Sequence, residues 1–207
     1  MLELYVSSII TFFVIIDPLG CAPIFAGLTT EAPAAERRAM AIRAVGVASI
    51  ILVAFALFGE GLLKGLGIQL DSFKIAGGIM LFLIALEMVF ERRTQRREDR
   101  AAKVATDPEQ AEDVSIFPMA MPMIAGPGSI ASVMLLGARN PGLAEHLVVL
   151  GAMATILLLT LVALLAAGPL MRLLGVKIEA VITRLLGVLL AALAVQFVID
   201  GVARQLR

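Results

Sequence analysis

Asp17 lies in the middle of the first long apolar stretch of the chain and is followed at once by Pro18. A charged carboxyl group at the centre of a membrane helix costs roughly 2.5–3.5 kcal/mol on insertion scales, so such a residue is a functional candidate by default. Its chemistry would be to bind a substrate ammonium group, or to carry a coupling proton or cation. A structural role fits equally well, because Asp followed by Pro is a natural start for a helix. One residue can serve both roles.

A second interruption, Gly126-Pro127-Gly128-Ser129, lies in a later apolar stretch. A half-helix that starts near Ser129 would present unpaired N–H groups and the positive end of its dipole, which suit a carboxylate. The glycines would let a ligand approach the backbone closely, and the Ser129 hydroxyl would add a donor. The alternative is a kink whose backbone groups are satisfied by neighbouring helices.

The two interruptions belong to similar segments, residues 17–23 and 121–127, in which Pro18 pairs with Pro122 and Pro23 with Pro127 at an offset of 104. Proline inside a helix removes a backbone donor and clashes with the preceding turn. Two helices broken at matching depth in the two halves of a chain are typical of transporters built from repeated units. The predicted substrate-binding residues are Asp17, Pro18, Gly20, Cys21, Pro23, Pro122, Ala125, Gly126, Pro127, Gly128 and Ser129.

The elements that position these residues follow from composition. The chain has 207 residues, of which 60% are hydrophobic and 16% charged, and the charges cluster between the apolar stretches. A soluble domain is nearer half apolar, so this composition predicts an integral membrane protein. The net charge is zero, which gives no reason to expect nucleic acid as a partner. A single Cys excludes an internal disulfide.

Six stretches are long enough to cross a bilayer, each needing about 20 residues. We therefore expect an all-α polytopic membrane protein whose residues 1–207 form a single membrane domain. The predicted spans are 4–28, 40–62, 72–90, 114–137, 144–168 and 180–202.

Lys and Arg in the connections predict the orientation. With both termini outside, 12 of these residues fall on the inner side and 5 on the outer side. Residues 91–113 then form a charged cytoplasmic loop. The simplest interpretation is a solvated connector. The alternative is contact with anionic lipid, since basic clusters just inside a span attract acidic headgroups, and the residues concerned are Arg92, Arg93, Arg96 and Arg97.

A duplication extends beyond the two interruptions. Gly78 matches Gly187, and Ala85 matches Ala194, at an offset of 109. Three spans repeated in tandem put the second copy in the membrane upside down, which is the arrangement of alternating-access transporters. The alternative is a chance match between apolar sequences. We expect two inverted three-helix repeats, residues 1–90 and 114–207. The first helix of each repeat, which is the first or fourth helix of the chain, should be broken at the midplane.

The segments 17–25 and 122–128 resemble the paired signatures of the MarC family of six-span bacterial inner-membrane proteins. The resemblance covers essentially the whole chain. It implies a multi-pass protein of the bacterial inner membrane with both termini on the outer side. Some relatives are described as transporters of small neutral amino acids such as alanine and glycine, and the family is grouped with LysE-type amino-acid exporters. Many members carry Asn where this chain has Cys21, a departure that bears on substrate choice.

We therefore expect a secondary transporter, and by resemblance an exporter, of small zwitterionic amino acids. The sequence is compatible with coupling of transport to Na⁺ or to H⁺. It is also compatible with association into homo-oligomers. The alternatives are a cation permease that uses Asp17 and unwound carbonyls, or a non-transporting scaffold or stress-response membrane protein. One His and one Cys do not provide the usual ligands of a Zn or haem site, and the chain has neither a Walker motif nor a G-x-S-x-G elbow. These features predict no enzyme activity, no metal centre and no bound cofactor.

Overall fold

The structure, a computed structural model, describes residues 1–30, 32–90, 92, 95, 99, 113–140 and 142–205, with only the backbone for 171–180. The described residues form helices joined by short connections. Among the described residues, five helical segments are long and apolar enough to cross a membrane, and a bent pair brings the number to as many as six. The predicted all-α membrane fold is confirmed at this level. The predicted loop 91–113 lies almost wholly outside the described residues, as do Arg93, Arg96 and Arg97.

The first predicted span consists of two helices, α1 (Leu2–Ile16) and α2 (Pro18–Leu28), which together form an apolar segment of 27 residues. The interruption is limited to Asp17, which adopts a left-handed conformation with φ 58° and ψ 69°. Pro23, which the sequence placed within the broken segment, lies inside α2. The break is therefore narrower than the proline spacing predicts.

The next two spans lie in α3 (Ala34–Gly65) and α4 (Leu70–Val89). Gly67 ends the turn that joins them, with a positive φ of 70° that a residue without a side chain adopts freely. The N–H groups of Gly67 and Ile68 donate to carbonyl groups in the last turn of α3, at 3.1 and 2.9 Å. This arrangement stops α3 and turns the chain back toward the membrane.

The fourth predicted span is the bent pair η1 (Ser115–Ile124) and α7 (Pro127–Arg139), whose axes meet at 49°. The η1 segment is irregular, because Phe117 and Met121 have extended backbone conformations. Each precedes a cis-proline. Proline has no N–H to donate, so a regular helical ladder cannot run through this segment. The sequence predicts one interruption in this span, whereas η1 is irregular along most of its length.

The last two spans lie in α8 (Leu143–Leu165) and α9 (Ala167–Gln205). α9 has 39 residues, of which Val181–Gln205 form the candidate span. The sequence predicts a connection between 168 and 180, but the backbone there is helical. Pro169 is compatible with this because it lies in the first turn, where its missing N–H would have no partner anyway.

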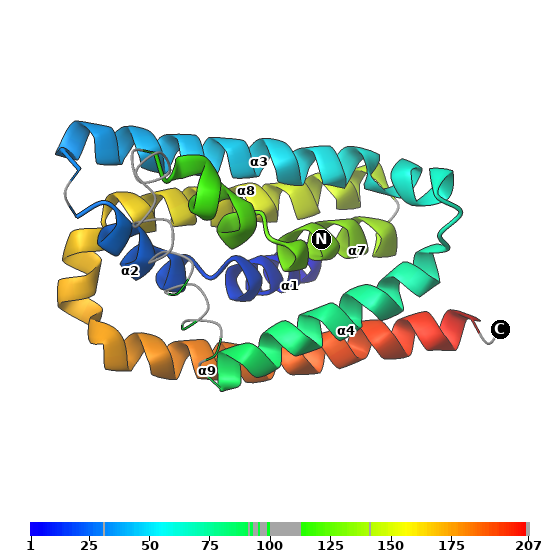
Figure 1. Cartoon of the computed structure of the whole chain (residues 1–207). Coiled ribbons are helices and arrows are strands. Elements are labelled where there is room, and N and C mark those ends of the chain that lie inside the picture. Colours follow the sequence, from blue (N-terminus) through cyan, green and yellow to red (C-terminus); the bar gives the residue numbers. More distant parts are fainter. Residues whose placement is uncertain are drawn as a thin grey trace.

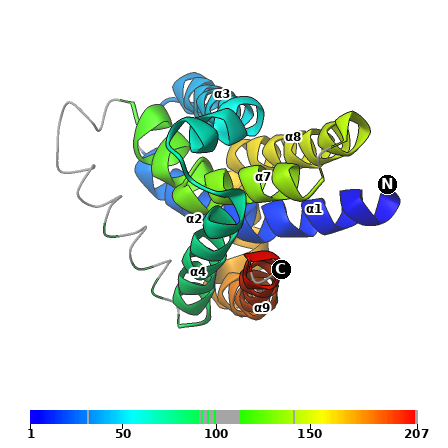
Figure 2. The ribbon, with the colours of Figure 1, turned by 90° about the vertical axis from the view of Figure 1, so that its right-hand side faces the viewer.

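Figure 1 shows α3 and α8 covering one side of the molecule, α4 and α9 packed together on the opposite side, and α1, α2 and α7 between them. Figure 2, which looks along α3 and α9, shows α1 running across the view. α1 therefore crosses α9 instead of lying parallel to it. The hydroxyl groups of Tyr5 and Thr155, 2.9 Å apart, link α1 to α8.

The outer surface of the helices is apolar. Large hydrophobic side chains such as Phe58, Leu158 and Leu185 are 71%, 64% and 63% exposed. Monomeric soluble proteins rarely expose apolar surface of such extent. Several polar side chains, by contrast, are buried, among them Ser8, Ser132 and Thr160 at 0% exposure. This distribution fits a protein whose surroundings are lipid.

The packing of α4 against α9 is reciprocal. A Cβ on Gly78 would lie 2.8 Å from the carbonyl oxygen of Ala194, and a Cβ on Gly187 would lie 3.1 Å from the carbonyl oxygen of Ala85. Gly187 follows Gly78 by 109 residues, and Ala194 follows Ala85 by the same number. Small residues at these positions let the two backbones approach closely.

Candidate functional site

Asp17 belongs to both helices of the first span. Its N–H donates to the carbonyl oxygen of Phe13 at 2.9 Å and so completes the last turn of α1. Its carboxylate accepts a hydrogen bond of 3.1 Å from the N–H of Gly20, which caps the first turn of α2. The side chain is buried, with 2% exposure. The predicted capping role of Asp17 is thus present, and the carboxylate lies inside the protein.

Each interruption frees a backbone carbonyl group, which a side chain five residues later takes up. The Cys21 thiol donates to the carbonyl oxygen of Ile16, with the two atoms 3.4 Å apart. The Ser129 hydroxyl donates to the carbonyl oxygen of Ile124 at 2.7 Å. A carbonyl buried without a partner costs about 1–3 kcal/mol, so these two contacts stabilise the interrupted segments. Both side chains had been predicted as parts of the site, and both have this structural role.

The second interruption differs from the first at its helix start. Gly126 is the N-cap of α7 and Pro127 its first residue, and within the described part of the chain no side-chain hydrogen bond caps this helix start. A Cβ on Gly126 would overlap the carbonyl oxygen of Pro122, so this backbone arrangement requires glycine at position 126. The first turn of α7 therefore presents backbone N–H groups and a positive dipole end, the features that favour an anion.

The two interruptions meet inside the protein. A Cβ on Gly128 would lie 3.3 Å from the side chain of Ile15, two residues before Asp17. The same Cβ would lie 2.7 Å from Ile84, so α4 covers this contact. Segments that are more than 100 residues apart in the sequence thus pack against each other where both helices are interrupted.

The predicted site residues differ in exposure. Pro127 is exposed, and Pro23 and Pro122 are half-buried. The remaining predicted site residues are buried. These buried residues are Asp17, Pro18, Gly20, Cys21, Ala125, Gly126, Gly128 and Ser129.

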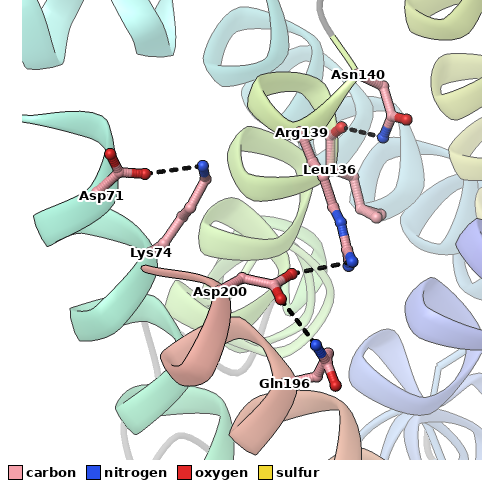
Figure 3. Close-up of polar contacts among 7 residues, drawn as sticks. All are labelled: Asp71, Lys74, Leu136, Arg139, Asn140, Gln196 and Asp200. Carbon is pink, nitrogen blue, oxygen red and sulfur yellow. Dashed lines mark hydrogen bonds and ion pairs between the residues drawn. The ribbon is translucent and has the colours of Figure 1, made fainter. Parts of the chain in front are cut away.

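Charged residues of α4, α7 and α9 lie near one another (Figure 3), and this group was missed in the sequence. Lys74 is only 3% exposed and pairs with Asp71 at 3.0 Å. Arg139 of α7 pairs with Asp200 of α9 at 2.9 Å, and Gln196 donates to the same carboxylate at 2.7 Å. The spacing of Asp71 and Lys74, three residues apart on one helix, was the available signal.

A second ion pair lies at the start of η1. Arg43 of α3 contacts Asp113 at 2.8 Å, and the N–H of Ser115 donates to the Asp113 carboxylate at 2.9 Å. Burial raises the pKa of Asp113, but the hydrogen bond from the Ser115 N–H and the charge of Arg43 outweigh it. The pKa of Asp113 is therefore below its ordinary value of 3.8. The pair fastens the beginning of the fourth predicted span to α3.

Apolar helices with a lipid-compatible surface and buried polar groups at helix interruptions define a multi-pass integral membrane protein. More narrowly, the chain belongs to the MarC family of integral membrane proteins, which it matches over residues 2–206. The family resemblance of the two proline-containing segments is thereby confirmed.

Curated relatives of similar length support this assignment. The chain is 37% identical over 204 residues to the UPF0056 membrane protein MJ1677 of Methanocaldococcus jannaschii, with 97% of each chain covered. It is 34% identical over 201 residues to the UPF0056 membrane protein YvbG of Bacillus subtilis, covering 97% of this chain and 95% of the relative. It is 33% identical over 200 residues to the UPF0056 inner membrane protein YhgN of Escherichia coli K12, with 95% of each covered. No solved structure matches the chain.

Proposed function

We propose that this protein is a secondary transporter of small neutral amino acids and not an enzyme. One observation supports the proposal: α1 and α7 pack against each other, and each has a buried polar residue near the helix end that lies at this contact. Gly128 packs against Ile15, while Asp17 and Ser129 are each 2% exposed. Interrupted helices that meet in the membrane interior are the usual location of substrate sites in secondary transporters.

The chemistry of the two interruptions is complementary to a zwitterion. Asp17 offers a carboxylate for the substrate ammonium group, and the uncapped first turn of α7 offers N–H groups for the substrate carboxylate. The walls are small or aliphatic, since Gly128 contacts Ile15 and Ile84. A substrate with a small side chain, such as alanine or glycine, fits these surroundings. The opposed charges also disfavour a substrate that carries only one of them.

We further propose that the two halves are inverted repeats that exchange conformations. The reciprocal contacts of α4 and α9 support this. When a two-fold axis relates two helices, each contact from the first helix to the second is repeated by the equivalent residues from the second helix to the first. Val198 contacts Gly78 while Val89 contacts Gly187, again with partners 109 residues apart. The first helical residues after the interruptions, Pro18 and Pro127, have the same offset. In such an arrangement a closed central site opens to either side in turn.

The proposed location is the bacterial cytoplasmic membrane, with both termini on the outer side. The described end of α9 and the connection between α3 and α4 lie at the same end of the molecule (Figure 1), which fits a C-terminus on the outer side. Arg92, which is exposed, would then be on the inner side, within reach of anionic lipid. We also propose that transport runs in the direction of export and is coupled to Na⁺ or H⁺. Association into homo-oligomers is a further hypothesis.

Flux of labelled alanine and glycine into proteoliposomes of the purified full chain tests the proposal. Uptake should be saturable, should be inhibited by other small zwitterions, and should be unaffected by lysine or by an amine without a carboxylate. A Na⁺ or pH gradient that drives accumulation would identify the coupling ion. Cation flux that needs no amino acid would instead support a permease, and vesicles with folded protein but no flux would contradict transport.

A further inference from the structure

An apolar groove with a volume of about 640 Å³ lies between α1 and α9. Its rim includes Leu2, Val6 and Ile10, which are 76%, 46% and 49% exposed. These residues are four positions apart, so they form a stripe along one face of α1. The floor includes Val14 and Leu190, with 2% and 1% exposure. Since α1 crosses α9 (Figure 2), the groove occupies the angle between the two helices.

The polar atoms of the groove are unevenly distributed. Thr11 lies on the floor with 2% exposure, but its hydroxyl donates to the carbonyl oxygen of Ser7 at 2.8 Å and is thereby satisfied. Among the described residues that line the groove, Glu3 carries the single charge. It lies in the first turn of α1, is exposed, and has no ion-pair partner within the described part of the chain. The groove is thus apolar along its floor, with the Glu3 carboxylate at one end.

We propose that this groove binds one acyl chain of a bilayer phospholipid whose headgroup carries a primary ammonium group, with that ammonium at Glu3. The groove opens on the lipid-facing surface of two membrane helices, so the molecules that reach it are lipids. Its volume is within the usual range for small-molecule sites, about 300–1,000 Å³. An aminophospholipid carries an ammonium group in its headgroup and apolar acyl chains next to it. Its ammonium group would pair with the Glu3 carboxylate while one acyl chain occupies the apolar groove. The site is separate from the buried interruptions and does not depend on transport.

The headgroup determines the selectivity of this site. A lipid tail that enters the groove moves there from the apolar interior of the bilayer and not from water. The transfer itself therefore has little hydrophobic driving force. The contact between Glu3 and the ammonium group is near the membrane surface, where an ion pair contributes modestly and is screened by salt. Exposed pairs of this kind correspond to about a two- to fivefold preference in binding.

Native mass spectrometry of the full chain in detergent, titrated separately with phosphatidylethanolamine and phosphatidylglycerol, tests the proposal. For the first lipid bound, we expect phosphatidylethanolamine to bind about two- to fivefold more tightly. Glu3→Gln should remove this preference, whereas Glu145→Gln should retain it. Glu145 is a matched control because it lies in the first turn of α8 and outside the groove.

A second variant tests the groove itself. Ser7 is an exposed residue of the lining, so Ser7→Phe fills the groove without disturbing the interior. It should weaken the first binding step for both lipids, and Val162→Phe, on the exposed face of α8, should not. Equal binding of the two lipids to the unmodified protein would overturn the headgroup assignment. Unchanged binding to Ser7→Phe, or disulfide-linked dimers of Ile10→Cys in vesicles, would overturn the lipid as occupant of the groove.

Discussion

Gly78 of α4 lies against the backbone of Ala194 of α9, so closely that a Cβ on Gly78 would be 2.8 Å from the Ala194 carbonyl oxygen. The contact recurs between Gly187 and Ala85 with the helices exchanged. Because both contacts involve backbone atoms, neither can be relieved by rotating a side chain. Gly78 and Gly187 therefore let the backbones of α4 and α9 approach more closely than residues with side chains would allow.

Gly78→Ala and Gly187→Ala should each destabilise the protein by about 1–3 kcal/mol, because the added methyl group forces the helices apart. Gly46→Ala is the matched control: this glycine also lies inside a membrane helix, and nothing lies within 4 Å of the position of its Cβ. The control should be neutral or stabilising by up to about 1 kcal/mol. Unfolding in detergent, followed by circular dichroism during titration with a denaturing detergent, measures the differences.

A clear difference between Gly78→Ala and Gly187→Ala would contradict the reciprocal packing, since equivalent contacts predict similar losses. If Gly78→Ala and Gly187→Ala changed the free energy of unfolding as little as Gly46→Ala does, α4 and α9 would have room to separate.

Ser129→Ala should cost about 1–3 kcal/mol, because it leaves the buried carbonyl group of Ile124 without a hydrogen-bond donor. Ser132→Ala provides the comparison. Ser132 is as deeply buried, but its hydroxyl contacts the Gly128 carbonyl four residues back, within the regular helix. That carbonyl keeps its backbone partner, so the control should lose no more than about 1 kcal/mol. The same unfolding titration measures both variants, and equal losses would contradict a special role for the Ser129 hydroxyl.

Asp113 provides a pH-dependent test. Its pKa is lowered in the folded protein, so its contact with Arg43 stabilises the fold above the ordinary pKa of 3.8 and is lost as the pH falls through the folded-state value. Asp113→Asn should destabilise the protein at neutral pH by about 0.2–1 kcal/mol, given that both side chains are partly exposed. The difference from the unmodified protein should shrink as the pH falls through the folded-state pKa of Asp113 and vanish once the carboxyl group is protonated in both states. Thermal unfolding in detergent at neutral pH and over a series of acidic pH values checks this.

A double-mutant cycle separates this ion pair from other effects. Arg43→Gln should have a similar effect to Asp113→Asn, and the two changes together should cost less than the sum of the single changes. Strict additivity would show that the two residues do not stabilise the fold through each other.

The spans could be predicted from the sequence because length and apolar composition determine them. The predicted span 40–62 lies within Ala34–Gly65, and the predicted span 72–90 nearly coincides with Leu70–Val89. The continuous backbone of α9 could not be predicted, because Gly168 and Pro169 are typical of turns. Proline is also accepted in the first turn of a helix, and only the structure distinguishes the two cases.

The proline pairing did not predict where the helices begin. Proline spacing pairs Pro18 with Pro122, whereas in the structure Pro18 and Pro127 both begin a helix and Pro122 lies within η1. Proline alone does not determine where a helix restarts, because the same residue occurs within helices and in irregular segments. The donors to the freed carbonyl groups were likewise unpredictable, because they depend on the rotamers of Cys21 and Ser129.

Asp17→Asn tests the central claim most directly. Asn caps helices as well as Asp and tolerates the left-handed conformation, so the variant should fold and keep the hydrogen bond from Gly20. Hydrogen bonds to charged groups contribute about 1.5–3 kcal/mol, so loss of the carboxylate should reduce alanine flux into proteoliposomes by about tenfold or more. Cys21→Ser, which keeps a donor to the Ile16 carbonyl group, should retain flux. Full alanine flux through a folded Asp17→Asn variant would contradict a charge-based role for Asp17 in substrate binding.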